Sequence, residues 1–291
     1  MSPTPGLRDS SRMGNRHIPC LVLLAGAAGL AACVPAAAWP RVVSTLDVRS
    51  RPVPAGDWIT DYDTALATIA ATMRRDLGLP LGEASLIFYR NREAFAEALV
   101  ASGYDEQLAA DSARTLAAIG GFRRVLLNDD LVSDLEWPNR VALLAHELTH
   151  TLQYEVGGGQ RGSSEQWLRE GFAEWVEVEV LAALGLTTRE AARATARRRV
   201  SAARSVPALR EMVTFPDWVR VAQQSGTDAI YAQAMLAAGL LVERHGAPAV
   251  VAYFARFGAS ADRLANFRLA FGEDLSAFEQ RFNGYLDSAV R

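Results

Sequence analysis

The sequence has no lysine, only two cysteines and little net charge. All 30 basic residues are arginines and face 33 acidic residues, which gives a formal net charge of -3. A chain with this balance has no overall attraction to a polyanion, so we expect no nucleic-acid partner. Half of the 291 residues are hydrophobic, which is enough to form a sizeable core.

A hydrophobic run long enough to span a membrane comfortably is also missing near the N-terminus. The apolar segment 18–32 follows Arg12 and Arg16 and is short and rich in glycine and alanine. These features predict a secretory signal over residues 1–32, with an uncleaved anchor or a buried helix as the alternative.

The end of this segment, Leu30-Ala31-Ala32-Cys33, resembles the bacterial lipobox. The resemblance implies cleavage before Cys33 and attachment of a diacylglycerol to its sulfur, so that acyl chains hold the protein to a membrane. Val34 is not the aspartate that favours retention at the inner membrane. We therefore expect a cell-envelope lipoprotein on the periplasmic face of the outer membrane.

The cysteine content fits this expectation. Cys20 would leave with the signal and Cys33 would carry the lipid, so no disulfide is expected in the mature chain. Residues 33–56 contain four prolines and predict a linker between the lipid and the folded domain.

The remaining chain, residues 57–291, predicts one α+β domain that is rich in helices. An amphipathic pattern covers residues 58–77, and short apolar runs of strand length occupy residues 85–90 and 123–128. Beyond residue 139 the pattern is almost wholly helical and includes three closing helices at 247–257, 261–271 and 275–290. We expect a front part with strands to about residue 157 and a helical back part from about residue 163.

The strongest chemical motif is H-E-x-x-H at residues 146–150, within a helix predicted from Pro138 to Gly157. Residues four apart share one helix face, so His146 and His150 can reach one cation while Glu147 lies beside them. The motif is expected by chance in under about one chain in a hundred of this length. Two half-exposed histidines on a surface helix are the alternative.

A second predicted helix can supply a third ligand. Ser163 and Gln166 form a plausible capping box, and the helix then carries Glu170. Catalytic zinc takes three protein ligands and keeps a further position open. The turn Gly157-Gly158-Gly159 can fold this helix back so that Glu170 meets the histidines.

Together, H-E-x-x-H and the later segment Trp167-Leu168-Arg169-Glu170-Gly171-Phe172-Ala173 resemble the gluzincin metallopeptidases. The segments 231–234 and 240–246 further resemble bacterial peptidase MA-like domains. The resemblance implies a thermolysin-like zincin domain with a bound Zn2+ ion.

The resemblance also implies a role for individual residues. His146, His150 and Glu170 would bind zinc, and Glu147 would be the general base. Glu174 stands where related enzymes often have an acidic residue that holds a ligand histidine, although aspartate is commoner there. The alternative is that Glu174 is simply a surface side chain in contact with solvent.

Two tyrosines are candidates for stabilising the oxyanion. Tyr231 falls near the place of the catalytic tyrosine in related aminopeptidases, and Tyr154, one turn after His150, is the second candidate. Core packing is the alternative for both.

The sequence departs from the aminopeptidases upstream of the histidines. The G-x-M-E-N type segment that reads a free substrate amine is missing, so an endopeptidase is the better expectation. Residues 123–128 could be the edge strand that aligns an extended peptide, or a plain core strand.

These observations predict a lipid-anchored zinc metallopeptidase that acts on a peptide or protein substrate. One alternative is a catalytically inactive peptidase fold that serves as a binding or scaffold module in the envelope. The other is a purely structural envelope lipoprotein.

Overall fold

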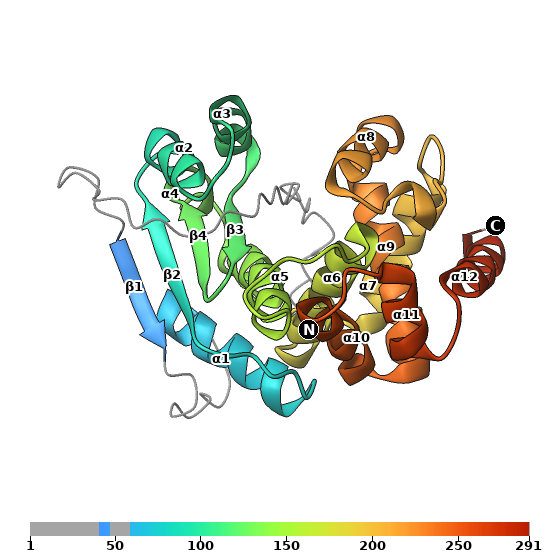
Figure 1. Ribbon diagram of the computed structural model, residues 1–291. Coiled ribbons are helices and arrows are strands. Elements are labelled where there is room, and N and C mark those ends of the chain that lie inside the picture. The colour runs from blue at the N-terminus through green and yellow to red at the C-terminus, as the bar shows by residue number, and fades with distance from the viewer. Residues whose placement is uncertain (1–40, 47–58, 291) are drawn as a thin grey trace, which may run out of the picture.

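The computed structural model describes residues 41–46 and 59–290 (Figure 1). The expected signal at residues 1–32 and the lipidation site Cys33 lie outside this range. Within the expected linker, Arg41–Leu46 forms strand β1 and pairs with the sheet, so this part of the linker prediction is wrong. The segment is rich in β-branched residues, which favour a strand.

The front part combines a small sheet with helices on both of its faces. The sheet has four strands in the order β1-β2-β4-β3; β2 and β4 are parallel and the two other pairs are antiparallel. The elements that follow β1 are α1 (Tyr62–Arg75), β2 (Ala84–Tyr89), α2 (Arg92–Ala101), α3 (Glu106–Thr115), β3 (Ala118–Gly121), β4 (Arg124–Asn128) and α4 (Asp129–Val132).

The alternation of side chains along the strands decides which helices cover each face. Leu86 and Phe88 of β2 face the main core, which includes residues of α1 and α5 (Trp137–Val156). Ile87 and Tyr89 face a smaller cluster with α2 and α3. The sheet is therefore enclosed by helices, and α5 lies between it and the back part (Figure 1).

Strand β4 covers most of the segment proposed as a possible edge strand, but it lies in the interior of the sheet between β2 and β3. The edge-strand interpretation of residues 123–128 is therefore wrong and the core-strand alternative is correct. The edge strand next to α5 is β3, which the sequence pattern did not predict.

The back part is helical, as expected. Its elements are α6 (Gln166–Ala183), α7 (Arg189–Ser201), η1 (Leu209–Glu211), α8 (Phe215–Ser225), α9 (Thr227–His245), α10 (Ala247–Ala255), η2 (Arg256–Gly258), α11 (Arg263–Phe271) and α12 (Leu275–Val290). Helix α6 packs against both α5 and α9. The α+β, helix-rich class is confirmed.

The start of α6 differs from the prediction. Glu165 is the N-cap residue and no side chain caps the helix, so the capping box at Ser163 and Gln166 does not form. The Ser163 hydroxyl donates instead to the carbonyl oxygen of Ala261, at 3.0 Å. Tertiary contact has replaced local capping here.

In the described part of the chain, no helix is both long enough and apolar enough to cross a membrane.

Candidate metal centre

Helix α5 presents the two histidines of the H-E-x-x-H motif on one buried face. His146 and His150 are exposed by only 1% and 0%, and their Nε2 atoms are 3.2 Å apart. The spacing of four residues brings the rings together as expected. The alternative of two half-exposed surface histidines is therefore wrong.

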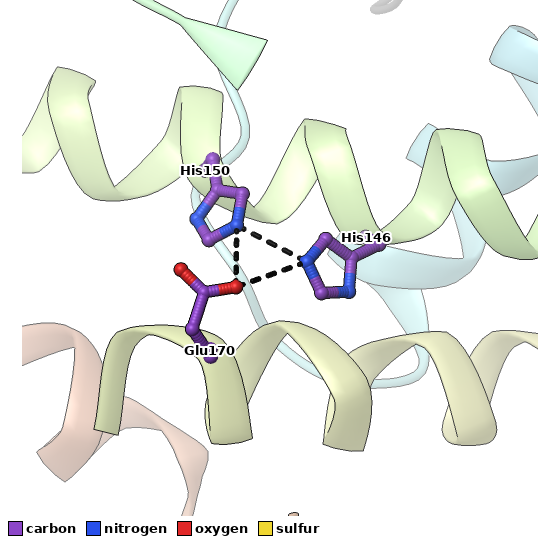
Figure 2. A group of neighbouring side chains, drawn as sticks. All are labelled: His146, His150 and Glu170. Carbon is purple, nitrogen blue, oxygen red and sulfur yellow. Dashed lines mark hydrogen bonds and ion pairs between the residues drawn. The ribbon is translucent and has the colours of Figure 1, made fainter. Parts of the chain in front are cut away.

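Glu170 on α6 completes the group. Its Oε2 atom lies 3.4 Å from Nε2 of His146 and 3.5 Å from Nε2 of His150 (Figure 2). The carboxylate is fully buried, and Oε2 accepts no hydrogen bond from the described residues. A buried carboxylate oxygen that faces two imidazole nitrogens fits a bound cation, so these three residues could hold a metal ion.

The charges in this group affect one another strongly. Burial favours neutral Glu170, but the neighbouring histidines outweigh this effect and lower the pKa of its carboxyl to about 2. Burial likewise disfavours a charge on His146, yet the carboxylates of Glu170 and Glu174 raise its pKa well above 6.5. The carboxylates around His146 therefore favour a positive charge at this position, which suits a divalent cation.

Two glutamines to which the sequence analysis gave no role at the metal site hold the candidate ligands. Gln153 Oε1 lies 2.9 Å from Nδ1 of His150, while its Nε2 donates to the backbone oxygen of Arg169 at 2.9 Å. Gln166 Nε2 donates to Oε1 of Glu170 at 2.7 Å. Their helical spacing from His150 and Glu170 could have revealed both residues.

Two carboxylates face the other nitrogen of His146. Nδ1 lies 3.3 Å from Oε1 of Glu174, where the sequence analysis expected such a partner, and 3.8 Å from Oε2 of Glu177, which it missed. Burial and the charge of Glu174 raise the pKa of Glu177 to about 8. These three residues form a second cluster of possible ligand atoms around the same imidazole.

Glu147 is fully buried and points toward the edge strand β3. Its Oε2 accepts a hydrogen bond from the backbone N–H of Gly120. A side chain at Gly120 would overlap the backbone oxygen of Glu147 and lie 2.9 Å from Cβ of His150. The glycine therefore lets β3 approach the motif helix closely enough to orient Glu147.

The two candidate tyrosines occupy different places. The Tyr231 ring on α9 lies 6.2 Å from the His146 ring, centroid to centroid, and packs edge-on against Trp218 at 5.0 Å. The Tyr154 ring lies 5.6 Å from the guanidinium carbon of Arg169. Tyr231 is thus the tyrosine adjacent to a candidate ligand ring.

Comparison of the chain with protein-family models, with curated proteins and with solved structures finds no match.

Proposed function

We propose that this protein is a zinc-dependent metallopeptidase that hydrolyses peptide bonds. The observation that carries the proposal is the convergence of His146, His150 and Glu170, whose facing atoms are separated by 3.2 to 3.5 Å. Two imidazole nitrogens and one carboxylate oxygen form a ligand set that suits catalytic zinc.

Each residue of the proposed site has its own role in the hydrolysis of the peptide bond. Zinc at this site would polarise the substrate carbonyl and lower the pKa of the attacking water. Glu147 takes a proton from that water and passes it to the leaving amine. Tyr231 donates a hydrogen bond to the developing oxyanion, and Glu174 accepts one from Nδ1 of His146, which leaves Nε2 free to bind the metal.

The same proposal extends to the fold family. The ligand pattern, with two histidines on one helix and Glu170 on the next, supports a thermolysin-like gluzincin domain of the peptidase MA-like type. An endopeptidase remains our expectation for the cleavage mode, since the motif that reads a free substrate amine is missing.

We also propose a lipid anchor at Cys33, on the strength of the Leu30-Ala31-Ala32-Cys33 motif. The catalytic domain would then act at the periplasmic face of the outer membrane. Mass spectrometry of the detergent-extracted protein should find a diacylglyceryl group on Cys33, and an unprocessed N-terminus would contradict this placement.

The peptidase proposal is tested with mature protein that lacks residues 1–32. We expect about one zinc ion per chain by elemental analysis and cleavage of a broad peptide library. Glu147→Gln should keep the zinc but lower hydrolysis by at least about a hundredfold, because the general base is lost. Hydrolysis that survives this change would contradict the mechanism, and zinc without any hydrolysis would favour the inactive binding module.

A further inference from the structure

Two arginines beside the candidate metal centre have no ion-pair partner within residues 41–46 and 59–290. Arg169 immediately precedes Glu170 on α6 and is fully buried, while Arg161 lies in the preceding loop and is partly exposed. Their hydrogen bonds go to neutral atoms, such as the amide oxygen of Gln166 for Arg161 and the backbone oxygen of Arg161 for Arg169.

Several donors in this region have no hydrogen-bond acceptor among the described residues. They are Nε and Nη2 of Arg169, Nε of Arg161 and the hydroxyl group of Tyr104, and all are buried atoms. The Arg169 guanidinium lies over the rings of Tyr154 and Phe254, at 5.6 and 5.9 Å. Its Nη1 donates to the backbone oxygen of Arg161, whereas Nε and Nη2 have no acceptor among the described residues. A buried guanidinium group without an acceptor is costly, and an anion bound at these donors would remove that cost.

Glu170 does not supply this anion. It follows Arg169 directly in the chain, but its Oε1 accepts a hydrogen bond from Gln166 and its Oε2 faces the two histidines.

Arg161 is linked to the candidate metal centre through Gln166. Arg161 Nη2 donates to Oε1 of Gln166, and Nε2 of the same amide donates to Glu170. Tyr104 comes from the front part, between α2 and α3, and interacts electrostatically with both Arg161 and Glu147. The donors therefore come from both parts of the molecule.

The loop that carries Arg161 is fixed in place. Gly162 has a positive φ of 67°, and a side chain there would lie 2.6 Å from Cβ of Phe257. The Ser163 hydroxyl donates to Ala261, and the backbone N–H of Glu165 donates to the hydroxyl oxygen of Tyr253 at 3.1 Å. Arg161 is therefore held at the site before any ligand arrives, which lowers the entropic cost of binding.

We propose that Arg161, together with Tyr104 and Arg169, binds a carboxylate group of the peptide substrate beside the metal centre. This inference rests on the proposed peptidase function. A carboxylate accepts two parallel N–H bonds from a guanidinium group and supplies the charge that the two arginines lack. Its source is the C-terminal carboxylate of the peptide or the side chain of an aspartate or glutamate.

Four peptides separate these two sources. A sequence without acidic residues is made with a free C-terminal carboxylate and with a C-terminal amide, and the amide is also made with one glutamate or one matched glutamine. We expect the wild-type protein to prefer a carboxylate in one of the two pairs by about tenfold to a hundredfold in kcat/KM. In Arg161→Gln, the ratio of kcat/KM for the carboxylate peptide to kcat/KM for its neutral counterpart should fall toward one. It should stay unchanged in the control Arg220→Gln, which removes an exposed arginine on α8 paired with Asp217.

Binding supplies a readout that does not need turnover. Calorimetry with zinc-loaded Glu147→Gln protein should give a lower Kd for the preferred carboxylate peptide than for its neutral counterpart, and adding Arg161→Gln should abolish the difference. Tyr104→Phe, which removes only a hydroxyl group, should reduce the preference severalfold, so the test does not depend on one variant folding.

The outcomes separate the two proposals. Equal Kd values for all four peptides, or no peptide binding, would overturn the carboxylate site even if the wild-type protein cleaves every peptide. A carboxylate preference that depends on Arg161 in the binding experiment, without hydrolysis by the wild-type protein, would support the site and reject the peptidase function.

Discussion

The backbone of Gly171 on α6 lies so close to the carbonyl group of Ala234 on α9 that no side chain fits between them. Gly171 immediately follows the candidate ligand Glu170, and Ala234 lies one helical turn after Tyr231. This contact therefore sets the distance between α6, which carries the candidate ligand Glu170, and α9, which carries the proposed oxyanion donor Tyr231.

Replacing Gly171 with alanine should push the two helices apart. Alanine is favoured over glycine inside a helix by up to about 1 kcal/mol, but a methyl group forced into a full contact typically costs about 1–3 kcal/mol. We expect Gly171→Ala to lower the free energy of unfolding and to weaken zinc binding. Urea denaturation and a competitive zinc titration measure the two effects.

Gly284 on α12 is the matched control. It is also a helical glycine, but nothing lies within 4 Å of the position that a Cβ atom would take. Gly284→Ala should therefore raise the free energy of unfolding by about 0.5–1 kcal/mol. If Gly171→Ala stabilises the protein to the same extent, α6 and α9 do not touch as described.

Loss of one proposed ligand should empty the metal site without unfolding the protein. His146→Ala and Glu170→Ala should each reduce zinc affinity by more than about a hundredfold, a larger loss than removal of a residue that only supports a ligand. Far-UV circular dichroism should change little, because most of the hydrophobic core lies elsewhere. His245→Ala is the control and should keep its zinc, since His245 lies at the end of α9 and pairs with Glu273. Full zinc content in His146→Ala or Glu170→Ala would contradict the assignment of these residues as ligands.

Zinc binding should depend on pH because His146 must give up a proton. Burial opposes its charge, but the surrounding carboxylates raise its pKa well above 6.5. The metal-free protein therefore keeps this proton at neutral pH, and zinc affinity should rise as the pH increases through the raised pKa. Calorimetry in buffers with different ionisation enthalpies should detect proton release on binding, and an affinity that does not vary with pH would contradict the prediction.

The metal-free protein should also have a stability maximum in mildly acidic solution. The raised pKa of His146 contributes stability that is complete below about 6.5 and is lost as the pH rises through the folded-state value. The pKa of Glu170, lowered from 4.5 to about 2, contributes stability that is present above 4.5 and is lost as the pH falls toward 2. Thermal unfolding of chelator-treated protein should therefore show the highest Tm between about pH 4.5 and 6.5, and Glu170→Gln should flatten the profile on both sides.

The parts of the site that the sequence predicted depend on spacing within a helix. His146 and His150 are four residues apart on α5, and Glu174 follows Glu170 by the same interval on α6. Helix geometry fixes such relationships without any knowledge of the tertiary structure. The same rule of spacing applies to Gln153, three residues after His150, and to Gln166, four residues before Glu170, each of which contacts its candidate ligand.

The missed features depend on contacts between distant segments. Strand β3 has four residues, two of them glycines, so its own sequence gives a weak strand signal. The interior position of β4 follows from pairing with β2 and β3, which no local pattern reveals. Arg161 and Tyr104 likewise interact electrostatically only in the folded chain.

The two carboxylates on Nδ1 of His146 should contribute unequally to zinc binding. Glu174 lies 3.3 Å from this nitrogen, whereas Glu177 lies 3.8 Å away. Burial and the charge of Glu174 raise the pKa of Glu177 to about 8, so Glu177 is mostly protonated at neutral pH. We therefore expect Glu174→Gln to weaken zinc binding by about tenfold to a hundredfold and Glu177→Gln by only a few-fold. In Glu174→Gln, loss of the neighbouring negative charge lowers the pKa of Glu177, so Glu177 can become a carboxylate and partly replace Glu174 beside His146. The double variant should therefore lose more zinc affinity than the sum of the two single losses. Competitive zinc titrations of the three variants decide this, and a larger loss in Glu177→Gln than in Glu174→Gln would reverse the assignment of the carboxylate that orients His146.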